Sequence, residues 1–375
     1  MLSDGTFQAP VSVLTLLAIA LLTLQFGIPV AYYLYAKTKW LKKGWNIRID
    51  RSYRPKISVI IPTYNEEEYI ERKLNNLLEQ TYPLELIEVL IADDSSKDRT
   101  LDIIRRWIKK HPELNVKVIT SETRKGKMRS IFDALKYVNG ELVVITDADA
   151  ILDKNALLNT VKYFADPSVG VLTASIKYYA EKFAEHENIY RNYYNVIRVA
   201  ESKAHSTPIH SGVYQVIRRD IFEKIPQHSY IEDCFIASYV AFSGFRAIQV
   251  DDVWAYEPLR GSTIRTKIRR AQYNVATFLN AKRLAKKNNV YKPSQFDYIW
   301  NIEWYLYIIN PWLLLIGIVL LFLSMIQGAI ISRFLLVLGV LLLVLKTFRT
   351  WILQQIYLII AMSKNLWNVE TVWRK

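Results

Sequence analysis

Two aspartates, Asp147 and Asp149, follow a run of apolar and β-branched residues and are separated only by Ala148. If the segment is extended, residues i and i+2 point the same way, so both carboxylates aim at one point. Two like charges held that close are costly unless a cation lies between them and another group. Oxygen ligands favour Mg²⁺ or Mn²⁺ over zinc, and these ions usually bridge a few carboxylates to a diphosphate. The pair therefore predicts a divalent-cation site suited to a nucleotide diphosphate.

Polar clusters also follow two earlier apolar runs. The first is PTYNEEE, Pro62 to Glu68, and the second is DDSSKD, Asp93 to Asp98. In an open α/β sheet the carboxyl ends of the strands line the ligand crevice, so three clusters at three strand ends should converge on one site. Each cluster alone could be an ordinary turn or helix cap, with Ser95, Ser96 or Asp98 as the capping residue of the following helix.

A basic run, RKGKMR, extends from Arg124 to Arg129. The phosphate-binding loops of other folds are missing, since the sequence contains neither GxxxxGK[ST] nor GxGxxG. The basic run offers cations to phosphate oxygens instead, and Lys127 is the preferred candidate. The alternative is a solvated basic loop.

The elements that would position these residues follow an alternating pattern. Short β-branched runs suit strands of a sheet covered on both faces, and they lie at Ile57–Ile61, Ile87–Ala92, Val116–Ile119 and Leu142–Thr146. The segments between them carry apolar residues at helical spacing, for example Ile70, Leu74, Leu77 and Leu78. Strand–helix alternation with right-handed crossovers predicts an α/β fold with a doubly wound, mostly parallel sheet.

Hydrophobic residues make up 51% of the 375 residues and gather toward both ends of the chain. Val11 to Tyr35 carries no charge and is long enough to cross a bilayer core of ~30 Å. It lacks the basic n-region and the cleavage site of a signal peptide, so we expect a membrane anchor. Two further spans are expected at Trp304–Met325 and Ala329–Leu345, the second broken only by Arg333. Trp351–Met362 is too short to span unaided and is expected to lie in the interface.

Basic residues follow the first and third of these segments, at Lys37, Lys39, Lys42, Lys43, Arg48, Lys346, Arg349 and Lys364. The positive-inside rule then places the N-terminus outside and the middle region and the C-terminus in the cytoplasm. The net charge of +14 fits a cytoplasmic face on anionic lipid, and no nucleic-acid motif accompanies it. Cys234 is the only cysteine, which excludes an internal disulfide and a cysteine-based zinc site. We therefore expect an integral protein of the cell membrane, with no nucleic-acid partner.

Six segments, in this order, resemble the landmarks of a known family: SVIIPTYNEE, IADDSSKDRT, RKGKMRSIFDAL, VVITDADA, SGVYQVIRRDIF and YIEDCFIA. They are similar to family 2 inverting glycosyltransferases with the GT-A fold, above all to the membrane-bound branch with polysaccharide synthases and polyprenyl-phosphate sugar transferases. The resemblance covers Lys56 to Asn280, and the ordered set is specific although each motif alone is weak. It implies a nucleotide-sugar donor, a divalent cation, and displacement of the nucleotide with inversion at the anomeric carbon.

The resemblance also implies donor-binding residues at the ends of the first two strands. Pro62, Tyr64 and Glu66 match positions around the nucleoside, with Tyr64 near the base. Asp93 and Asp94 match the family's paired aspartates, one of which hydrogen-bonds the base.

The reacting groups are implied by two further motifs. Asp147 and Asp149 match the metal and diphosphate motif, and Glu232 and Asp233 match the motif whose aspartate deprotonates the acceptor. An acceptor hydroxyl is a poor nucleophile, so a positioned carboxylate that takes its proton is needed. Asp233 is the expected base, while Glu232 would orient the acceptor or cap the helix. The alternative for both acids is the first turn of a helix, where acids favour the helix dipole.

One segment departs from the family pattern. Processive synthases carry QxxRW near the acceptor channel, whereas this chain has TKIRR, Thr266 to Arg270. That change, and the few expected spans, favour transfer of a single sugar to a lipid-linked or short acceptor. Arg265 to Arg283 is typical of a basic amphipathic helix on a membrane surface, where Arg269 and Arg270 could meet a lipid phosphate. A plain surface helix is the alternative.

We therefore expect four parts: an anchor and basic flank (1–50), a cytoplasmic GT-A domain (51–262), a basic amphipathic helix and linker (263–300), and C-terminal transmembrane helices with an interfacial tail (301–375). The leading hypothesis is a membrane-anchored inverting glycosyltransferase with a lipid-linked acceptor. A processive polysaccharide synthase and a non-catalytic membrane scaffold with a nucleotide pocket are the two alternatives. Transfer assays separate the scaffold from the enzymes, and product length separates the two enzymes.

Overall fold

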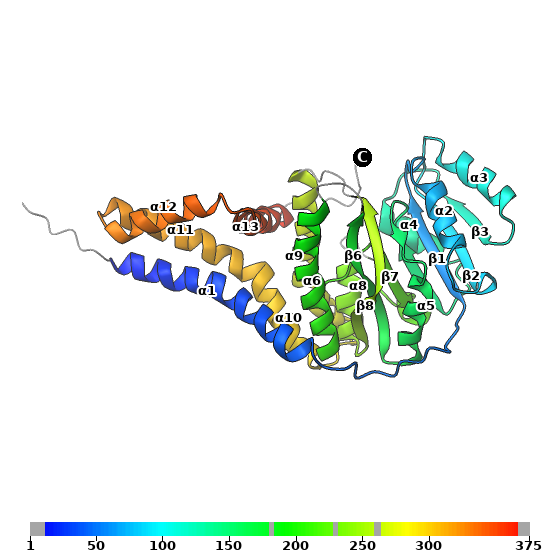
Figure 1. Cartoon of the computed structure of the whole chain (residues 1–375), viewed down its shortest axis with the longest axis horizontal. Helices are drawn as coiled ribbons and strands as arrows, with labels where there is room; N and C mark the ends of the chain where they lie inside the picture. The colour runs from blue at the N-terminus through cyan, green and yellow to red at the C-terminus, as the bar shows by residue number, and fades with distance from the viewer. Residues whose placement is uncertain (1–11, 180–183, 228–231, 259–263, 367–375) are drawn as a thin grey trace, which may run out of the picture. The chain divides into compact units, whose positions relative to one another are not determined.

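A computed structural model describes residues 12–179, 184–227, 232–258 and 264–366, with the side chains of 184–191 left out (Figure 1). The described chain forms two compact units. An α/β unit comprises the described residues of Ala36–Gly261 together with Leu279–Trp300. A helical unit comprises those of Met1–Tyr35, Ser262–Phe278 and Asn301–Asn368.

The α/β unit is built around one sheet of eight strands in the order β3-β2-β1-β4-β7-β6-β8-β5. The strands are β1 (Ile57–Thr63), β2 (Ile87–Asp93), β3 (Asn115–Thr120), β4 (Leu142–Thr146), β5 (Ile151–Leu152), β6 (Val169–Tyr179), β7 (Tyr214–Arg218) and β8 (Arg246–Pro258). β1 to β4 pair in parallel, as does β6 with β8, whereas β7 runs antiparallel to both β4 and β6. The prediction of a mostly parallel α/β sheet is confirmed.

The four strands expected from the sequence are all present, and β4 has the expected bounds. β5, β6, β7 and β8 were not predicted. The burial of β8 alternates toward its C-terminal end, and β7 runs antiparallel to both of its neighbours, so its pairing depends on residues distant in sequence.

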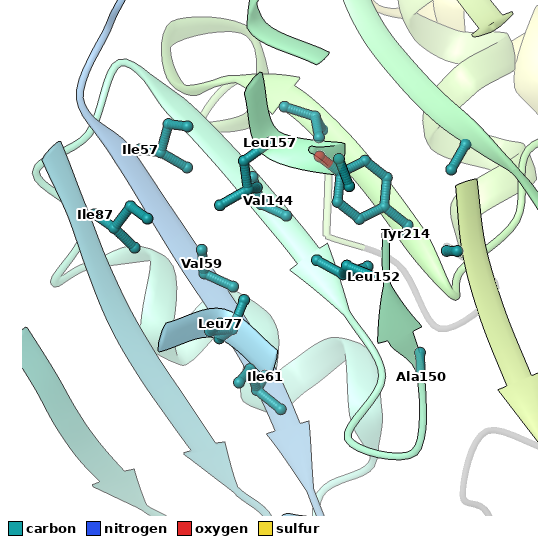
Figure 2. Close-up of a cluster of buried hydrophobic side chains, with 14 of the residues drawn as sticks. Ile57, Val59, Ile61, Leu77, Ile87, Val144, Ala150, Leu152, Leu157 and Tyr214 are labelled. Carbon is teal, nitrogen blue, oxygen red and sulfur yellow. The ribbon is translucent and has the colours of Figure 1, made fainter. Parts of the chain in front are cut away.

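Helices flank the sheet at α2 (Ile70–Leu78), α3 (Thr100–Lys110), α4 (Lys127–Leu135), α5 (Ala156–Val161), α6 (Ala184–Ala204), α7 (Arg219–Phe222) and α8 (Asp233–Phe242), with short turns η2 (Leu84–Leu86) and η3 (Lys162–Ala165). Figure 2 shows the core between them: Ile57, Val59 and Ile61 of β1 lie beside Ile87 of β2 and Val144 of β4. Ile60 points to the other face and is also fully buried. Both faces of the strand are therefore covered, which explains its continuous apolar run.

The register of the parallel strands brings their carboxyl ends together. Thr63, the last residue of β1, pairs with Asp93, the last residue of β2. On the other side of β1, Ile60 pairs with Ile145, one residue before the end of β4. The three polar clusters therefore begin at the same edge of the sheet, because each follows one of three adjacent parallel strands.

The helical unit contains α1 (Val13–Tyr35), α11 (Asn310–Ile326), α12 (Ile330–Leu342) and α13 (Lys346–Asn365), the π-helical turn η4 (Tyr305–Ile309), and the first part of α9 (Ile264–Lys287). The π-helical turn η1 (Ala36–Trp40), most of α10 (Phe296–Trp304) and the rest of α9 belong to the α/β unit. Three helices share a hydroxyl cluster: Thr15 of α1 bonds Ser324 of α11 at 2.7 Å and Ser332 of α12 at 2.8 Å. Such bonds satisfy polar groups between otherwise apolar helices.

By length and composition, two described helices could cross a membrane: Val13–Trp40 and Phe296–Ile326. The first covers the expected span Val11–Tyr35 from Val13 onward, whose first residue lies outside the described residues, and the second contains the expected span Trp304–Met325. The third expected span, Ala329–Leu345, forms only the 13-residue α12, which is bent by 105° from α13. This pair counts as one broken span or a re-entrant pair rather than as a straight helix. The expected interfacial segment, Trp351–Met362, lies within α13.

Candidate active site

The acidic pair lies in a turn, so the prediction of an extended segment is wrong. β4 ends at Thr146, and the Ala150 amide donates to the Asp147 carbonyl at 3.2 Å. Ala148 and Ala150 are buried in the core, whereas the Asp147 and Asp149 side chains are partly exposed. The two small buried residues reverse the chain here, so the carboxylates are positioned by the turn and not by strand alternation.

Lys127 connects the acidic turn with the acids at the start of α8. It is the first residue of α4, and its Nζ donates to Asp147 Oδ1 at 2.5 Å. Burial alone would lower the pKa of Lys127. The negative charges of Asp147, and to a smaller extent of Asp233 and Glu232, outweigh the effect of burial, so the pKa of this lysine is raised. Lys127 is therefore a permanent cation between the two groups of acids.

Asp233 opens α8 and faces Lys127 across Gly212. An added Cβ at Gly212 would come within 3.3 Å of the Asp233 Cγ and 3.4 Å of the Lys127 Nζ, so only glycine leaves this space open. Burial raises the pKa of Asp233, and Lys127 opposes this without cancelling it. The side-chain amide of Gln215 donates to the backbone carbonyl of Asp233 at 3.0 Å and fixes the start of the helix. Glu232 takes the N-cap position, but its side chain makes no capping hydrogen bond.

Asp93 and Asp94 organise the loops around the site. Asp93 is 1% exposed and accepts hydrogen bonds from Thr63 Oγ1 and from the Ser96 amide and hydroxyl. Asp94 is 4% exposed and accepts the Lys125 and Gly126 amides at 2.7 and 2.8 Å. The protein itself thus supplies hydrogen-bond donors to both carboxylates. Their contact with the nucleobase of the sugar donor stays a prediction.

Asp94 also fixes the loop that presents Lys127. Gly126, the residue before α4, has a φ of 93°, a conformation that glycine adopts without steric cost. This conformation turns two successive amides toward Asp94, and the carboxylate favours the positive end of the α4 dipole. The phosphate contact expected of this basic run stays a prediction, and Asp94 explains how the start of the run is held.

Tyr64 is covered on one face by Arg124. The Arg124 guanidinium carbon lies 3.7 Å from the centre of the Tyr64 ring, and its Nε is 3.8 Å from Asp94 Oδ2. A nucleobase that stacks on Tyr64 would use the other face of the ring. Pro62, near the end of β1, and Glu66, on the loop that follows, are partly buried, and the Glu66 backbone amide donates to the Thr100 hydroxyl at 2.8 Å. Arg124 was not singled out in the sequence, although it opens the basic run.

Lys73 is the clearest residue that sequence reasoning missed. It is fully buried on α2, and its Nζ donates to the Thr146 hydroxyl and the Ala150 carbonyl, at 2.8 and 2.9 Å. Burial lowers its pKa to about 7, while Asp147 and Asp149 act in the opposite direction. The sequence contained a signal for Lys73. Ile70, Leu74 and Leu77 form the apolar face of α2, and Lys73 lies on the same face, where a charged residue is unexpected.

The acidic turn suits a cation that also binds phosphate. Among the residues that the structure describes, no cluster of three or more His, Cys, Asp or Glu side chains could hold a metal alone. Asp147 and Asp149 offer hard oxygen ligands, which suit Mg²⁺ or Mn²⁺ when a diphosphate supplies the remaining oxygens. The residues present therefore fit such an ion only together with a bound nucleotide.

Arg269 and Arg270 lie in the part of α9 that belongs to the helical unit. Arg269 is 9% exposed and Arg270 is exposed. On the same helix Phe278 is buried and its ring stacks on that of Tyr307, with the ring centres 4.8 Å apart, whereas Leu279 is 49% exposed. The contact of both arginines with a lipid phosphate stays a prediction.

The mixed α/β sheet, with paired acids after β4, Lys127 at the start of α4 and Asp233 at the start of α8, fits the GT-A-type glycosyltransferases that the sequence resembles. Residues 58–226 match the family model for glycosyl transferase family 2. Over nearly its whole length the chain is similar to a mannosyltransferase, PcManGT from Pyrobaculum calidifontis, solved in complex with GDP-Man and Mn²⁺. The identity is 39%, the TM-score is 0.84, and the match covers 96% of this chain and 100% of that one. The chain belongs to glycosyl transferase family 2.

Two curated relatives match shorter stretches. A dolichyl N-acetyl-alpha-D-glucosaminyl phosphate 3-beta-D-2,3-diacetamido-2,3-dideoxy-beta-D-glucuronosyltransferase of Methanococcus voltae is 41% identical over 108 residues, 29% of this chain. The poly(ribitol-phosphate) beta-N-acetylglucosaminyltransferase TarS of Staphylococcus aureus is 38% identical over 125 residues, 32% of this chain. The matches span 33% and 21% of the length of these relatives. The chain is a glycosyltransferase.

Proposed function

We propose that this glycosyltransferase is anchored in the membrane and moves one sugar from a nucleotide-sugar donor to a lipid-linked acceptor, with inversion. The observation that carries the proposal is the position of Lys127, which bonds Asp147 at 2.5 Å and acts electrostatically on Asp233. The donor's diphosphate and the acceptor's hydroxyl must meet at the anomeric carbon. A cation between the donor-side and acceptor-side acids suits such a meeting point.

The donor is held at the strand ends in this proposal. Tyr64 would stack on the base, and Lys127 would exchange part of its contact with Asp147 for the donor's phosphate oxygens. A divalent cation bound at Asp147 and Asp149 would stabilise negative charge on the departing diphosphate. Lys127 would stabilise the same charge without any proton transfer, because its raised pKa keeps it protonated.

The acceptor is activated by Asp233. The acceptor hydroxyl attacks the anomeric carbon while its proton passes to the Asp233 carboxylate, and the bond to the diphosphate breaks with its electron pair. Burial raises the pKa of Asp233, which makes it a stronger base than an exposed aspartate. Attack from the face opposite the leaving group inverts the anomeric centre. Glu232, the preceding residue, would orient the acceptor.

The relatives suggest which substrates to test first. PcManGT was solved with GDP-Man and Mn²⁺, and its match covers 96% of this chain, so GDP-mannose is the first donor to test. The M. voltae relative is named for a dolichyl-phosphate-linked sugar acceptor, so a polyprenyl-phosphate-linked acceptor is the first acceptor class to test. The two long apolar helices support membrane anchoring, and the basic residues after the first helix support a cytoplasmic active site.

A donor screen with product analysis tests the proposal. The purified full-length protein is incubated with GDP-mannose, UDP-glucose and UDP-GlcNAc in turn, with Mn²⁺ and a membrane lipid extract, and the lipids are analysed by mass spectrometry. We expect one donor to yield a lipid product heavier by a single sugar residue. A ladder of products that each differ by one sugar would support a processive synthase instead. Release of nucleotide without any glycosylated lipid would refute the lipid-linked acceptor.

A further inference from the structure

A lysine without access to solvent lies directly beneath the acidic turn. Lys73 is 0% exposed and stands on the face of α2 that packs into the core. An ammonium group in such a place is costly unless its protons are all well bonded. A lysine is therefore a poor choice for packing alone, and its contacts should show what it does.

The contacts of Lys73 hold both ends of the turn. Its Nζ donates to the hydroxyl of Thr146, the last residue of β4, at 2.8 Å, and to the carbonyl of Ala150, which follows the turn, at 2.9 Å. Asp147 and Asp149 lie between these two anchors. The Thr146 hydroxyl in turn donates to the Val213 carbonyl at 2.9 Å, next to Gly212 and the acceptor-side acids. One ammonium group thus connects α2, the acidic turn and the segment that leads into β7.

We propose that Lys73 is a positioning residue that fixes the turn Asp147–Asp149 in the geometry that binds the divalent cation. Its hydrogen bonds go to a hydroxyl and a carbonyl and not to the carboxylates of Asp147 or Asp149, so Lys73 holds the two ends of the turn without bonding either carboxylate. A turn of three residues with two like charges would otherwise be free to separate them. The inference rests on the proposed function in one respect, which is that Asp147 and Asp149 are cation ligands.

The tether and the charge of Lys73 predict opposite changes in the affinity for the divalent cation when this lysine is replaced. A buried ammonium within electrostatic reach of both carboxylates repels a second cation, so its removal from an unchanged site would strengthen cation binding. Loss of the tether would instead weaken binding, because groups that orient metal ligands typically contribute about 10- to 100-fold in affinity. The direction of the change therefore decides between the two effects.

The experiment measures Mn²⁺ binding directly, in the presence of GDP, by the loss of the free-Mn²⁺ electron paramagnetic resonance signal. The full-length wild type is compared with Lys73→Met, which keeps the aliphatic stem, and with Lys73→Gln, which keeps one donor without the charge. We expect about 10- to 100-fold weaker Mn²⁺ binding for Lys73→Met and a smaller loss for Lys73→Gln. Thermal unfolding should show an equal or higher midpoint for Lys73→Met, because a buried charge is removed.

A matched control comes from the same helix. Asn75 accepts a hydrogen bond from the Trp107 Nε1 of α3 at 2.6 Å, away from the turn, so Asn75→Ala should lower stability and leave Mn²⁺ binding unchanged. If Lys73→Met does not fold, Thr146→Val removes one of the two anchors while Thr146→Ser keeps the hydroxyl. Only the valine variant should then weaken Mn²⁺ binding.

Equal or tighter Mn²⁺ binding by Lys73→Met, or by Thr146→Val, overturns the inference and leaves the proposed transfer reaction intact. Failure of the wild type to bind Mn²⁺ in the presence of GDP overturns the inference together with the cation site itself. Weaker binding by Asn75→Ala, to the same extent as by Lys73→Met, would show that any loosening of α2 has this effect and would also overturn it.

Discussion

Replacement of Asp233 by asparagine is the change that bears most directly on the mechanism. Asparagine has the same shape but cannot accept the proton of the acceptor hydroxyl. The backbone around the residue should be kept, since the Gln215 amide bonds the carbonyl of residue 233 and not its side chain. The narrow space beside Gly212 should also accept the new side chain, because its volume barely changes. The variant therefore removes the base and its charge interaction with Lys127, while the remaining side-chain oxygen can still accept a hydrogen bond from the Gly212 backbone.

The size of the effect follows from the surroundings of the carboxylate. General-base catalysis usually contributes ~10² to 10⁴ in rate, about 2.7 to 5.5 kcal/mol of barrier. Burial raises the pKa of Asp233, and a stronger base contributes more, so we expect turnover to fall by about 10³ or more. Donor affinity should change little, because the proposed diphosphate contacts at Lys127 and Asp147 are not substituted. The loss should therefore appear in kcat and not in the donor KM.

The assay follows the transfer of radiolabelled sugar into lipid, with donor and acceptor varied separately. Glu232→Gln is the matched control, since it neutralises the neighbouring acid at the N-cap of α8. It should be the milder change in the same assay. Near-normal turnover of Asp233→Asn together with loss of turnover in Glu232→Gln would show that the base is misassigned.

Three further predictions concern other parts of the site. Asp149→Ala should abolish transfer and the response to added Mn²⁺ or Mg²⁺, because it deletes a predicted cation ligand; metal-dependent activity near the wild-type level would contradict this. Tyr64→Ala should raise the donor KM more than it lowers kcat, since base stacking is largely uniform binding, and an unchanged donor affinity in a GDP titration would argue against the contact. Burial lowers the pKa of His210 to about 3 in the folded protein. Below about pH 6.5 the unfolded chain therefore binds a proton at His210 that the folded chain does not bind. The free energy of unfolding should then fall by up to ~1.4 kcal/mol per pH unit as the pH drops from about 6.5 toward 3. His210→Gln should therefore show a shallower decline of the unfolding midpoint between pH 6 and pH 4, and an unchanged slope would refute this role of His210.

Much of the α/β half could be predicted because its strands are buried on both faces. β1, β2 and β4 appear in the sequence as continuous β-branched runs, and each ends where a polar cluster begins. Parallel pairing then requires that the clusters share one edge of the sheet, which needs no knowledge of side-chain contacts. β7 is short and antiparallel, and its pairing with β4 depends on contacts distant in sequence, which periodicity cannot show.

The details of the site depended on contacts between distant residues. The turn at Asp147–Asp149 arises because Ala148 and Ala150 are drawn into the core, and an alternating pattern does not reveal that. The hydrogen bonds of Asp94 join the end of β2 to a loop some thirty residues later, so the structural role of Asp94 could not be seen in the sequence. Lys73 was the exception, since a charge on the apolar face of a helix is visible in the spacing of the amino acids alone.

The stereochemistry of transfer is the sharpest test of the proposed reaction, because a single displacement with Asp233 as the base forms no covalent intermediate. The full-length protein is supplied with an α-linked nucleotide sugar, carbon-13 labelled at the anomeric carbon, and with the acceptor found in the donor screen. Nuclear magnetic resonance of the purified product gives the anomeric configuration from the one-bond carbon–hydrogen coupling. We predict a β-linked sugar in the product. An α-linked sugar would mean that the configuration is retained, and direct displacement at this site would be contradicted.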